Sequence, residues 1–228
     1  MKPISDEEVI REMMNGIPSH RNICPSPETR QMSKKKLSWP KIEGTIDDRF
    51  EMIALEPTDS DTIEQTARIY RIGFPELFGG VYEDLHFPAR YRTLLEHMKI
   101  VVLRDMHQGR IASAWTLAPS EANMSIEFSL TVTDPEYRGR GLCRTFTRKV
   151  DGLVKETGTE LGIVYCATFH RTTQRVFEEL GFEKQATLKG FILANAGGGE
   201  YTRDTVVMYT KFYNGAEKLC PTETRVLE

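Results

Sequence analysis

A glycine- and arginine-rich turn is the segment of this chain best suited to binding an anion. From Val132 to Cys143 the chain reads Val-Thr-Asp-Pro-Glu-Tyr-Arg-Gly-Arg-Gly-Leu-Cys. An alternating apolar stretch ends at Val132, and the spacing of an amphipathic helix begins at Leu142. Exposed backbone N–H groups at a helix N-terminus attract anions, and glycines let a ligand approach the backbone closely. The turn therefore favours a diphosphate site, to which Arg138 and Arg140 would add charge-assisted hydrogen bonds.

Other interpretations of this turn make different demands on the sequence. The Walker motif is absent because no Gly-Lys-Ser/Thr follows, and the dinucleotide fingerprint lacks its third glycine and its early βαβ setting. An ordinary strand-to-helix turn and a nucleotide-phosphate binder with the same loop stay open as alternatives. The diphosphate hypothesis requires that the backbone N–H groups of this corner, near residues 138–143, are not already bonded within the protein.

Glu127 is the candidate general base. It lies on the expected strand just before the turn, and two-residue periodicity places Ser125, Glu127 and Ser129 on one face of that strand. A carboxylate in a half-buried cleft takes a proton directly or through a water molecule. A solvent-facing strand glutamate, or one that binds a cationic substrate, is the alternative interpretation.

The cysteines do not suggest a reactive or metal-binding site. Cys24, Cys143, Cys166 and Cys220 are far apart, and the chain has no CxxC pair. We therefore expect neither a metal site nor a disulfide framework, but reduced thiols as in the cytoplasm. A covalent intermediate on Cys143 or Cys166 is disfavoured, since neither has an evident His–Asp arrangement.

The elements that would position these residues follow one another as β-α-α-β-β-β-α-β-α-β-β. This order predicts an α/β fold around one mixed sheet. The apolar and turn patterns place strands at about 50–55, 100–104, 110–117, 124–132, 163–169, 182–192 and 205–212, and helices after residue 57 and at about 89–98, 142–154 and 172–180.

Three regions are expected along the chain. Residues 1–48 form an N-terminal extension or arm, residues 49–214 the main domain, and residues 215–228 a polar tail. Pro25 and Pro27 interrupt regular structure in the arm, and Trp39 is expected to attach it to the domain.

Bulk properties limit the function classes. The chain has 228 residues, 39% hydrophobic and 28% charged, which suits a globular fold with a sizeable core. A net charge of −3 argues against broad nucleic-acid binding. No apolar stretch approaches the length of a membrane span. The acidic, helix-like segment Met1–Gly16 does not resemble a secretory signal, so a cytoplasmic protein with no membrane partner is expected.

On these motifs the chain resembles the GNAT superfamily of acyl-CoA-dependent N-acyltransferases. The family's loop has the form Gln/Arg-x-x-Gly-x-Gly/Ala, whose three marked places hold Arg138, Gly141 and Cys143 here. Cys143 departs from Gly or Ala but keeps its backbone N–H. A second family feature, a helix that ends in Gly-Phe, is matched by the segment Glu178–Phe182. The resemblance covers about residues 50–213.

The resemblance implies a fold and a cofactor site. The fold is a GNAT-like mixed central sheet of about seven strands, splayed between strands 4 and 5 and flanked by about four helices. Backbone groups of the fourth strand would bind the pantetheine of acetyl-CoA like an added strand, and the loop would hold its pyrophosphate. The cofactor-binding residues so implied are Leu130, Val132, Arg138, Gly139, Arg140, Gly141, Leu142, Cys143 and His170.

Two family positions are occupied differently. His170 stands where the family often has an Asn that holds the cofactor, and a strand-end histidine bonded to backbone is equally compatible with its place. Phe177 stands where the family usually has the tyrosine that serves as general acid. Tyr165, Tyr201, Tyr209 or water are the remaining candidates for that acid.

The activity that the resemblance implies is transfer of an acetyl group from acetyl-CoA to the primary amine of a small molecule such as an amino acid or a polyamine. A protein N-acetyltransferase and a non-catalytic acyl-CoA-binding regulatory domain are the alternatives. The segment Phe177–Leu188 further resembles β-lysine N-acetyltransferases, although their Asn-rich continuation is replaced here by Lys189–Asn195. Neither nucleic acid nor membrane is an expected partner, and a homodimer is left open.

Overall fold

The computed structural model describes residues 36–75, 82–197 and 200–219. The chain divides into two units, Met1–Lys35 and Lys36–Glu228. The expectations for the arm up to residue 35 and for the end of the tail, residues 220–228, therefore lie outside the described residues.

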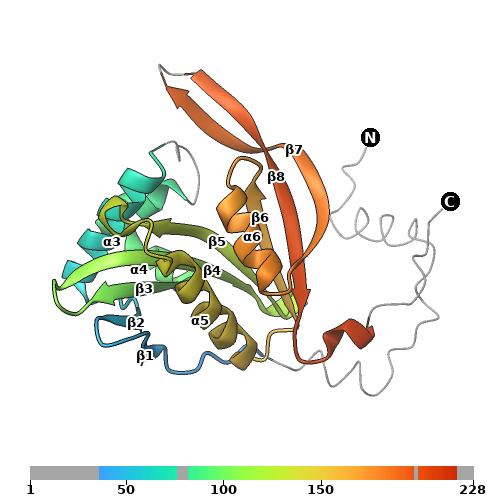
Figure 1. Cartoon of the computed structure of the whole chain (residues 1–228), viewed down its shortest axis with the longest axis horizontal. Coiled ribbons are helices and arrows are strands. Elements are labelled where there is room, and N and C mark those ends of the chain that lie inside the picture. Colours follow the sequence, from blue (N-terminus) through green and yellow to red (C-terminus); the bar gives the residue numbers. More distant parts are fainter. Residues whose placement is uncertain (1–35, 76–81, 198–199, 220–228) are drawn as a thin grey trace, which may run out of the picture. The chain divides into compact units, whose positions relative to one another are not determined.

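An eight-stranded mixed sheet forms the centre of this unit (Figure 1). Its strands are β1 (Glu43–Thr45), β2 (Phe50–Ala54), β3 (Lys99–Asp105), β4 (Arg110–Ser120), β5 (Ser125–Thr133), β6 (Leu161–Ala167), β7 (Glu183–Gly197) and β8 (Glu200–Phe212). Their order in the sheet is β1-β2-β3-β4-β5-β6-β8-β7. Only the neighbours β5 and β6 run parallel among these strands, and all other neighbouring pairs are antiparallel.

The expected mixed α/β sheet is confirmed, with one strand more than predicted. The additional strand β1 contains only Glu43, Gly44 and Thr45, all exposed, and pairs with β2. Such a short polar segment has no apolar alternation, so the sequence carries no signal for it. The last two strands also extend beyond their predicted ends, because their pairing continues to Gly197 and Glu200.

Four α-helices, α3 (Ser60–Gly73), α4 (Tyr91–His97), α5 (Leu142–Glu156) and α6 (Arg171–Glu179), lie in the described part of the chain. Short 3-10 helices are also present: η2 (Glu83–His86) and η3 (Pro88–Arg90) lie between α3 and α4, and η5 (Pro135–Tyr137) lies between β5 and α5. Helix α3 begins where predicted, because the Asp59 carboxylate accepts from Thr62 N–H at 3.0 Å and caps the helix. In Figure 1, α5 and α6 run across the sheet between the central strands and the viewer.

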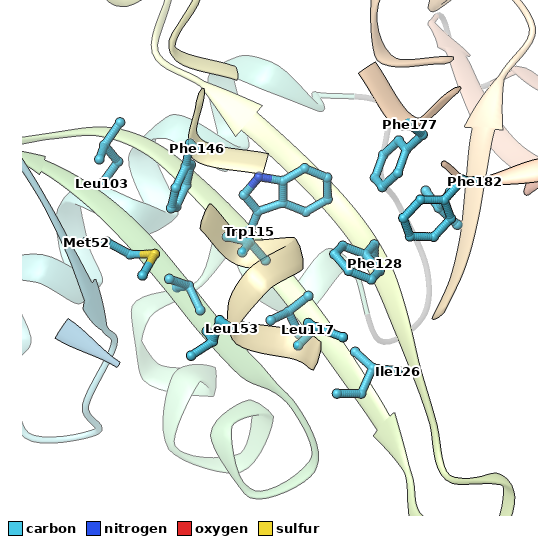
Figure 2. Packing of buried hydrophobic residues seen from close by; sticks show 14 of the residues in the cluster. Met52, Leu103, Trp115, Leu117, Ile126, Phe128, Phe146, Leu153, Phe177 and Phe182 are labelled. Atoms are coloured by element: carbon cyan, nitrogen blue, oxygen red, sulfur yellow. The ribbon is translucent and has the colours of Figure 1, made fainter. Parts of the chain in front are cut away.

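The two faces of the sheet bury separate hydrophobic cores. On one face, α5 and α6 cover a cluster rich in aromatic rings, in which Trp115, Phe128, Phe177 and Phe182 meet edge to face with centroids 4.9–6.0 Å apart (Figure 2). On the other face, α3 and α4 pack against alternate residues of the same strands, such as Ile100 and Val102. Because successive side chains of a strand point to opposite faces of the sheet, the same strands contribute to both cores.

Residues on either side of β1 also contribute to the first core. Leu37, Trp39, Ile42 and Ile46 are partly buried against it, and Ser38 N–H donates to the Thr157 carbonyl at 2.9 Å. Trp39 therefore packs against the domain, as expected. Within the described residues, no helix has the length and apolar character needed to cross a membrane.

Candidate functional site

The parallel strands β5 and β6 separate part of the way along the sheet. Their backbone pairing runs from Ser125–Leu161 to Phe128–Val164 and ends there, while β5 continues to Thr133. β6 likewise continues to Ala167. The expected splay between the fourth and fifth predicted strands is therefore present. It opens the edge of β5 over its last five residues, 129–133.

A bulge bends β5 where the strands part. On β4, Trp115 is the partner of Thr131 and the next residue, Thr116, is the partner of Ser129, so Leu130 is the inserted residue. A bulge increases the local twist and bends the strand that carries it. It therefore turns the end of β5 away from β6 at the point where their pairing stops.

The direction of the β5 backbone corrects part of the expected cofactor contacts. Asp134 N–H donates to the Ala112 carbonyl, and Ala114 of β4 is the partner of Val132. Backbone groups alternate between the two sides of an antiparallel strand, so those of Val132 face β4. The Val132 carbonyl also accepts from Ser113 Oγ at 2.6 Å.

The same alternation places the backbone N–H and carbonyl groups of Thr131 and Thr133 on the open edge of β5. The Leu130 carbonyl is engaged by the Tyr70 hydroxyl at 3.0 Å. Thr131 and Thr133 therefore present their backbone groups to the opening, whereas those of Val132, expected there from the sequence, face β4. The sequence does not indicate the outward direction of Thr131 and Thr133, because an inserted residue changes which positions face outward.

The turn after β5 leaves a run of backbone donors free. Arg138 N–H donates to the Pro135 carbonyl, and Thr145 N–H donates to the Gly141 carbonyl. In the described part of the chain, nothing accepts from the N–H groups of residues 139–144 in between. These residues are Gly139, Arg140, Gly141, Leu142, Cys143 and Arg144. The requirement set by the diphosphate hypothesis is therefore met from Gly139 onward, and only the N–H of Arg138 is engaged.

Two glycines give this corner its shape. Gly139 has φ +76° and Gly141, the residue before α5, has φ +73°. Both values lie in the left-handed region that residues with a Cβ avoid. A Cβ built on either glycine would meet no atom within 4 Å, so the corner is open in front of the free N–H groups.

Tyr137 anchors the corner to the sheet. Its side chain is 2% exposed, and its hydroxyl donates to Asp105 Oδ2 at 2.9 Å. The guanidinium of Arg140 lies over its ring, 5.5 Å from the centroid. Arg138 Nε donates to the Thr133 carbonyl at 3.1 Å, so Arg138 and Arg140 both lie at this corner with guanidinium nitrogens left for an anion.

A cleft joins the corner to the open edge of β5. It has a volume of about 700 Å³ and is lined by residues of the turn together with Thr131, Thr133 and Val176. A smaller cavity of about 140 Å³ lies at the parting of β5 and β6. Thr131 and His170 line both, so the two spaces adjoin. Their combined size suits a drug-sized or larger ligand.

Glu127 lies beside this parting in a small hydrogen-bonded cluster. Its Oε1 accepts from Ser129 Oγ at 2.7 Å and from the Tyr82 hydroxyl at 3.3 Å. Burial, more than the neighbouring carboxylate, raises the pKa of Tyr82, so this phenol stays a donor. The other carboxylate oxygen of Glu127, Oε2, accepts no hydrogen bond from the described residues. The Glu127 side chain is half-buried.

The sequence carries no signal for the contact between Tyr82 and Glu127. Tyr82 precedes Glu127 by 45 positions, and no local pattern relates residues so far apart in the chain. Their contact depends on where the fold places Tyr82, the residue before η2, relative to β5.

The position of the usual family acid is occupied by a buried ring. Phe177 is 0% exposed, lines the smaller cavity and packs against Trp115 and Phe128. Tyr209, one of the alternatives, donates to Glu178 Oε1 at 3.0 Å on the α6 side. Tyr165 lines the smaller cavity, and burial raises its pKa. The side chain of Tyr201 lies outside the described part of the chain.

His170 and the cysteines take different places around the cleft. His170 is exposed, precedes α6 and lines both the cleft and the smaller cavity. Cys143 lines the cleft, and burial raises the pKa of its thiol. Cys166 lines the smaller cavity, and burial raises its pKa to about 12. Both thiols are therefore protonated at neutral pH, which makes them poor nucleophiles.

Solved acetyltransferases share this fold at low sequence identity. A ribosomal-protein-S5-alanine acetyltransferase from Vibrio fischeri aligns with a TM-score of 0.62 and 14% identity, over 76% of this chain and 98% of that chain. A spermidine N-acetyltransferase from Vibrio cholerae, in complex with CoA and spermine, aligns with a TM-score of 0.56 and 18% identity, over 75% of this chain and 99% of that one.

A third similar structure is described only by its family. It is a probable acetyltransferase of the GNAT family from Chromobacterium violaceum, with a TM-score of 0.59 and 10% identity, over 78% of this chain and 90% of that chain. No protein-family model and no curated protein matches the sequence. In its strand order, its parted strands β5 and β6 and its glycine corner, this chain has the fold of the GNAT acetyltransferases.

Proposed function

We propose that this protein is an N-acetyltransferase that transfers the acetyl group of acetyl-CoA to the primary amine of a small molecule such as an amino acid or a polyamine. The observation that carries the proposal is the run of free backbone N–H groups at residues 139–144, placed where the open edge of β5 ends. The solved structures of the same fold include a spermidine N-acetyltransferase, which supports the reaction class.

The residues around the cleft fit the parts of the acyl donor. The free N–H groups at the start of α5, with Arg138 and Arg140, suit the diphosphate. The outward-facing N–H of Thr131 and Thr133 suit the amides of an extended chain. When bound, acetyl-CoA supplies an activated acetyl thioester. The cleft adjoins the smaller cavity, which is lined by Ser129, a hydrogen-bond partner of Glu127, and there an amine can meet the thioester.

Glu127 serves as the general base in this proposal. Ser129 and Tyr82 hold one carboxylate oxygen, which fixes the orientation of the other. That second oxygen is free to take the proton from an incoming ammonium group, either directly or through water. The Glu127 carboxylate also attracts a cation, so the same residue can bind the ammonium form of the substrate and then deprotonate it.

Tyr165 is the described tyrosine best placed to return a proton. It lines the cavity, whereas Phe177 has no proton to give and Tyr209 is engaged by Glu178. Its raised pKa keeps the phenol protonated at neutral pH. Loss of the usual acid is also the observation that favours the alternative of a non-catalytic acyl-CoA-binding domain.

Thiol release in the presence of acetyl-CoA and a panel of amines tests the proposal. Turnover with a small amine supports it, and turnover only with a protein N-terminus or lysine would transfer the assignment to the protein-acceptor class. Tight coenzyme A binding with no turnover on any amine would favour the non-catalytic domain. Thermal protection by ATP but not by coenzyme A would contradict the acyl-CoA site altogether.

A further inference from the structure

Asp204 is a carboxylate residue that lines the smaller cavity. It lies on β8, is half-buried and lines the smaller cavity beside Ile192 of β7, its partner across the hairpin. Tyr165 of β6 is the partner of Met208 of β8. Residues two apart on a strand share a face, so Asp204 lies on the same face of the sheet as Tyr165.

That face is also the face of Glu127. Glu127 and Ile163 are partners across β5 and β6, and Tyr165 lies two residues beyond Ile163. The two carboxylates, Glu127 and Asp204, therefore flank Tyr165 on one side of the sheet. This is the side covered by α3, opposite the aromatic core under α6.

The Asp204 carboxylate is unpaired in the described part of the chain. None of the described residues donates a hydrogen bond to it or forms an ion pair with it. The neighbouring Arg203 directs its guanidinium to the Gly190 carbonyl instead, at 3.1 Å. A half-buried carboxylate in a largely apolar cavity loses hydration that a cationic ligand can replace.

Aromatic rings lie between the two carboxylates. Tyr165 and Phe191 stack with centroids 5.0 Å apart and planes 24° from parallel, and Phe74 lines the same cavity. Such rings can pack against the methylene chain of an amine and can also interact with its positive charge.

The two carboxylates are too far apart to hold one ammonium group. Glu127 lies level with Ile163, whereas Asp204 lies beyond the pair Ala167–Val206. At about 3.3 Å per residue, the four steps along β6 from Ile163 to Ala167 alone span roughly 13 Å. A ligand that satisfies both carboxylates must therefore carry two separate positive charges.

We propose that Asp204 is a specificity-determining residue that selects acceptor amines with a second cationic group, separated from the reacting amine by an apolar chain. The inference rests on the proposed function, since it places the reacting amine at Glu127. Asp204 binds the distant charge, and the rings of Tyr165 and Phe191 cover the chain between them.

The variant Asp204→Asn tests this assignment, because it keeps the shape of the side chain and removes its charge. A series of straight-chain diamines is compared with the monoamines of the same chain lengths. We expect kcat/KM for the preferred diamine to fall about tenfold to a hundredfold, mainly through KM. Monoamine turnover and coenzyme A affinity are expected to stay within about twofold of the parent. Asp204→Glu is expected to recover part of the diamine preference.

A matched control removes the same charge from elsewhere on the hairpin. Glu200 is exposed on β8, and Glu200→Gln is expected to leave both substrate series unchanged. The inference would be overturned if Asp204→Asn lowered kcat/KM equally for diamines and monoamines, or if it left kcat/KM for diamines unchanged. An equally large fall of kcat/KM for diamines in Glu200→Gln would also overturn it.

Calorimetric binding of the diamines to the coenzyme A complex separates this inference from the proposed function. Diamine binding that weakens in Asp204→Asn supports the role of Asp204 even where no acetyl transfer is detected, in which case only the reaction is wrong. Diamine binding that is absent, or that does not depend on Asp204, contradicts the specificity role whatever the turnover.

Discussion

Phe128 of β5 and Val164 of β6 form the last backbone pair between the two parallel strands. Beyond this pair, β5 keeps its pairing with β4 but has an open edge toward β6. The side chains of Phe128 and Val164 both belong to the aromatic core under α6. The opening therefore begins on a packed core, which fixes the position at which the two strands part.

Replacement of Gly141 by glutamate is expected to abolish coenzyme A binding. The new carboxylate would lie against the free N–H groups and repel the diphosphate, and the φ of +73° adds a backbone cost of about 1–2 kcal/mol. Isothermal titration with coenzyme A measures the effect. Gly158→Glu is the matched control, since Gly158 has φ +83° with open space around its Cβ position and follows the far end of α5. Unchanged affinity in Gly141→Glu would refute the site.

Replacement of Glu127 by glutamine is expected to lower kcat about a hundredfold or more while coenzyme A affinity stays the same. Glutamine keeps the size of the side chain but cannot take a proton, and general-base contributions are of about this magnitude. Tyr82→Phe removes the hydrogen bonds of the Tyr82 hydroxyl to the carboxylate and to Ser129 Oγ, both 3.3 Å long, but leaves the carboxylate in place. A smaller loss, below about tenfold, is therefore expected. Equal turnover in Glu127→Gln and the parent would exclude Glu127 from the mechanism.

Acid should destabilise the protein through Asp105. The Arg49 guanidinium, which donates to the carboxylate at 3.0 and 2.6 Å, lowers the pKa of Asp105 from 3.8 to about 2. The ionised form is thus favoured in the folded state. Its contribution of about 2 kcal/mol is present above the ordinary pKa of an aspartate and is lost as the pH falls through the lowered pKa of the folded state.

Urea unfolding between pH 7 and pH 2 checks the prediction. Asp105→Asn is expected to unfold more easily at pH 7, and its difference from the parent should shrink as the pH approaches 2. Glu64→Gln, at an exposed position on α3, serves as the control and should follow the parent. A constant difference between Asp105→Asn and the parent over this range would show that the charge of Asp105 is not the cause.

Replacement of Phe177 by alanine is expected to lower the free energy of unfolding strongly. Its ring is fully buried between Trp115, Phe128 and Phe182, and Phe→Ala changes in cores cost about 3–5 kcal/mol. Thermal unfolding measures the loss. Phe212→Ala removes a ring that is 42% exposed and is expected to cost clearly less. Similar costs for the two variants would mean that the aromatic cluster is not the main support of the opening.

Much of this protein could be predicted from its sequence because the signals are local. The helix start at Asp59, the glycine corner at Gly139 and Gly141, and the α5 pattern each depend on residues close together in the chain. Caps, positive φ angles and apolar periodicity act over a few residues, so the order of elements and the anion corner were predictable.

The tertiary structure decided how distant segments meet. The inserted residue Leu130 changed which backbone groups of β5 face the opening, and no pattern in the sequence marks such an insertion. Tyr82 reaches Glu127 across 45 positions, and Asp204 enters the cavity from the last strand. Such contacts depend on strand register and packing between elements, whereas composition and spacing report only on near neighbours along the chain.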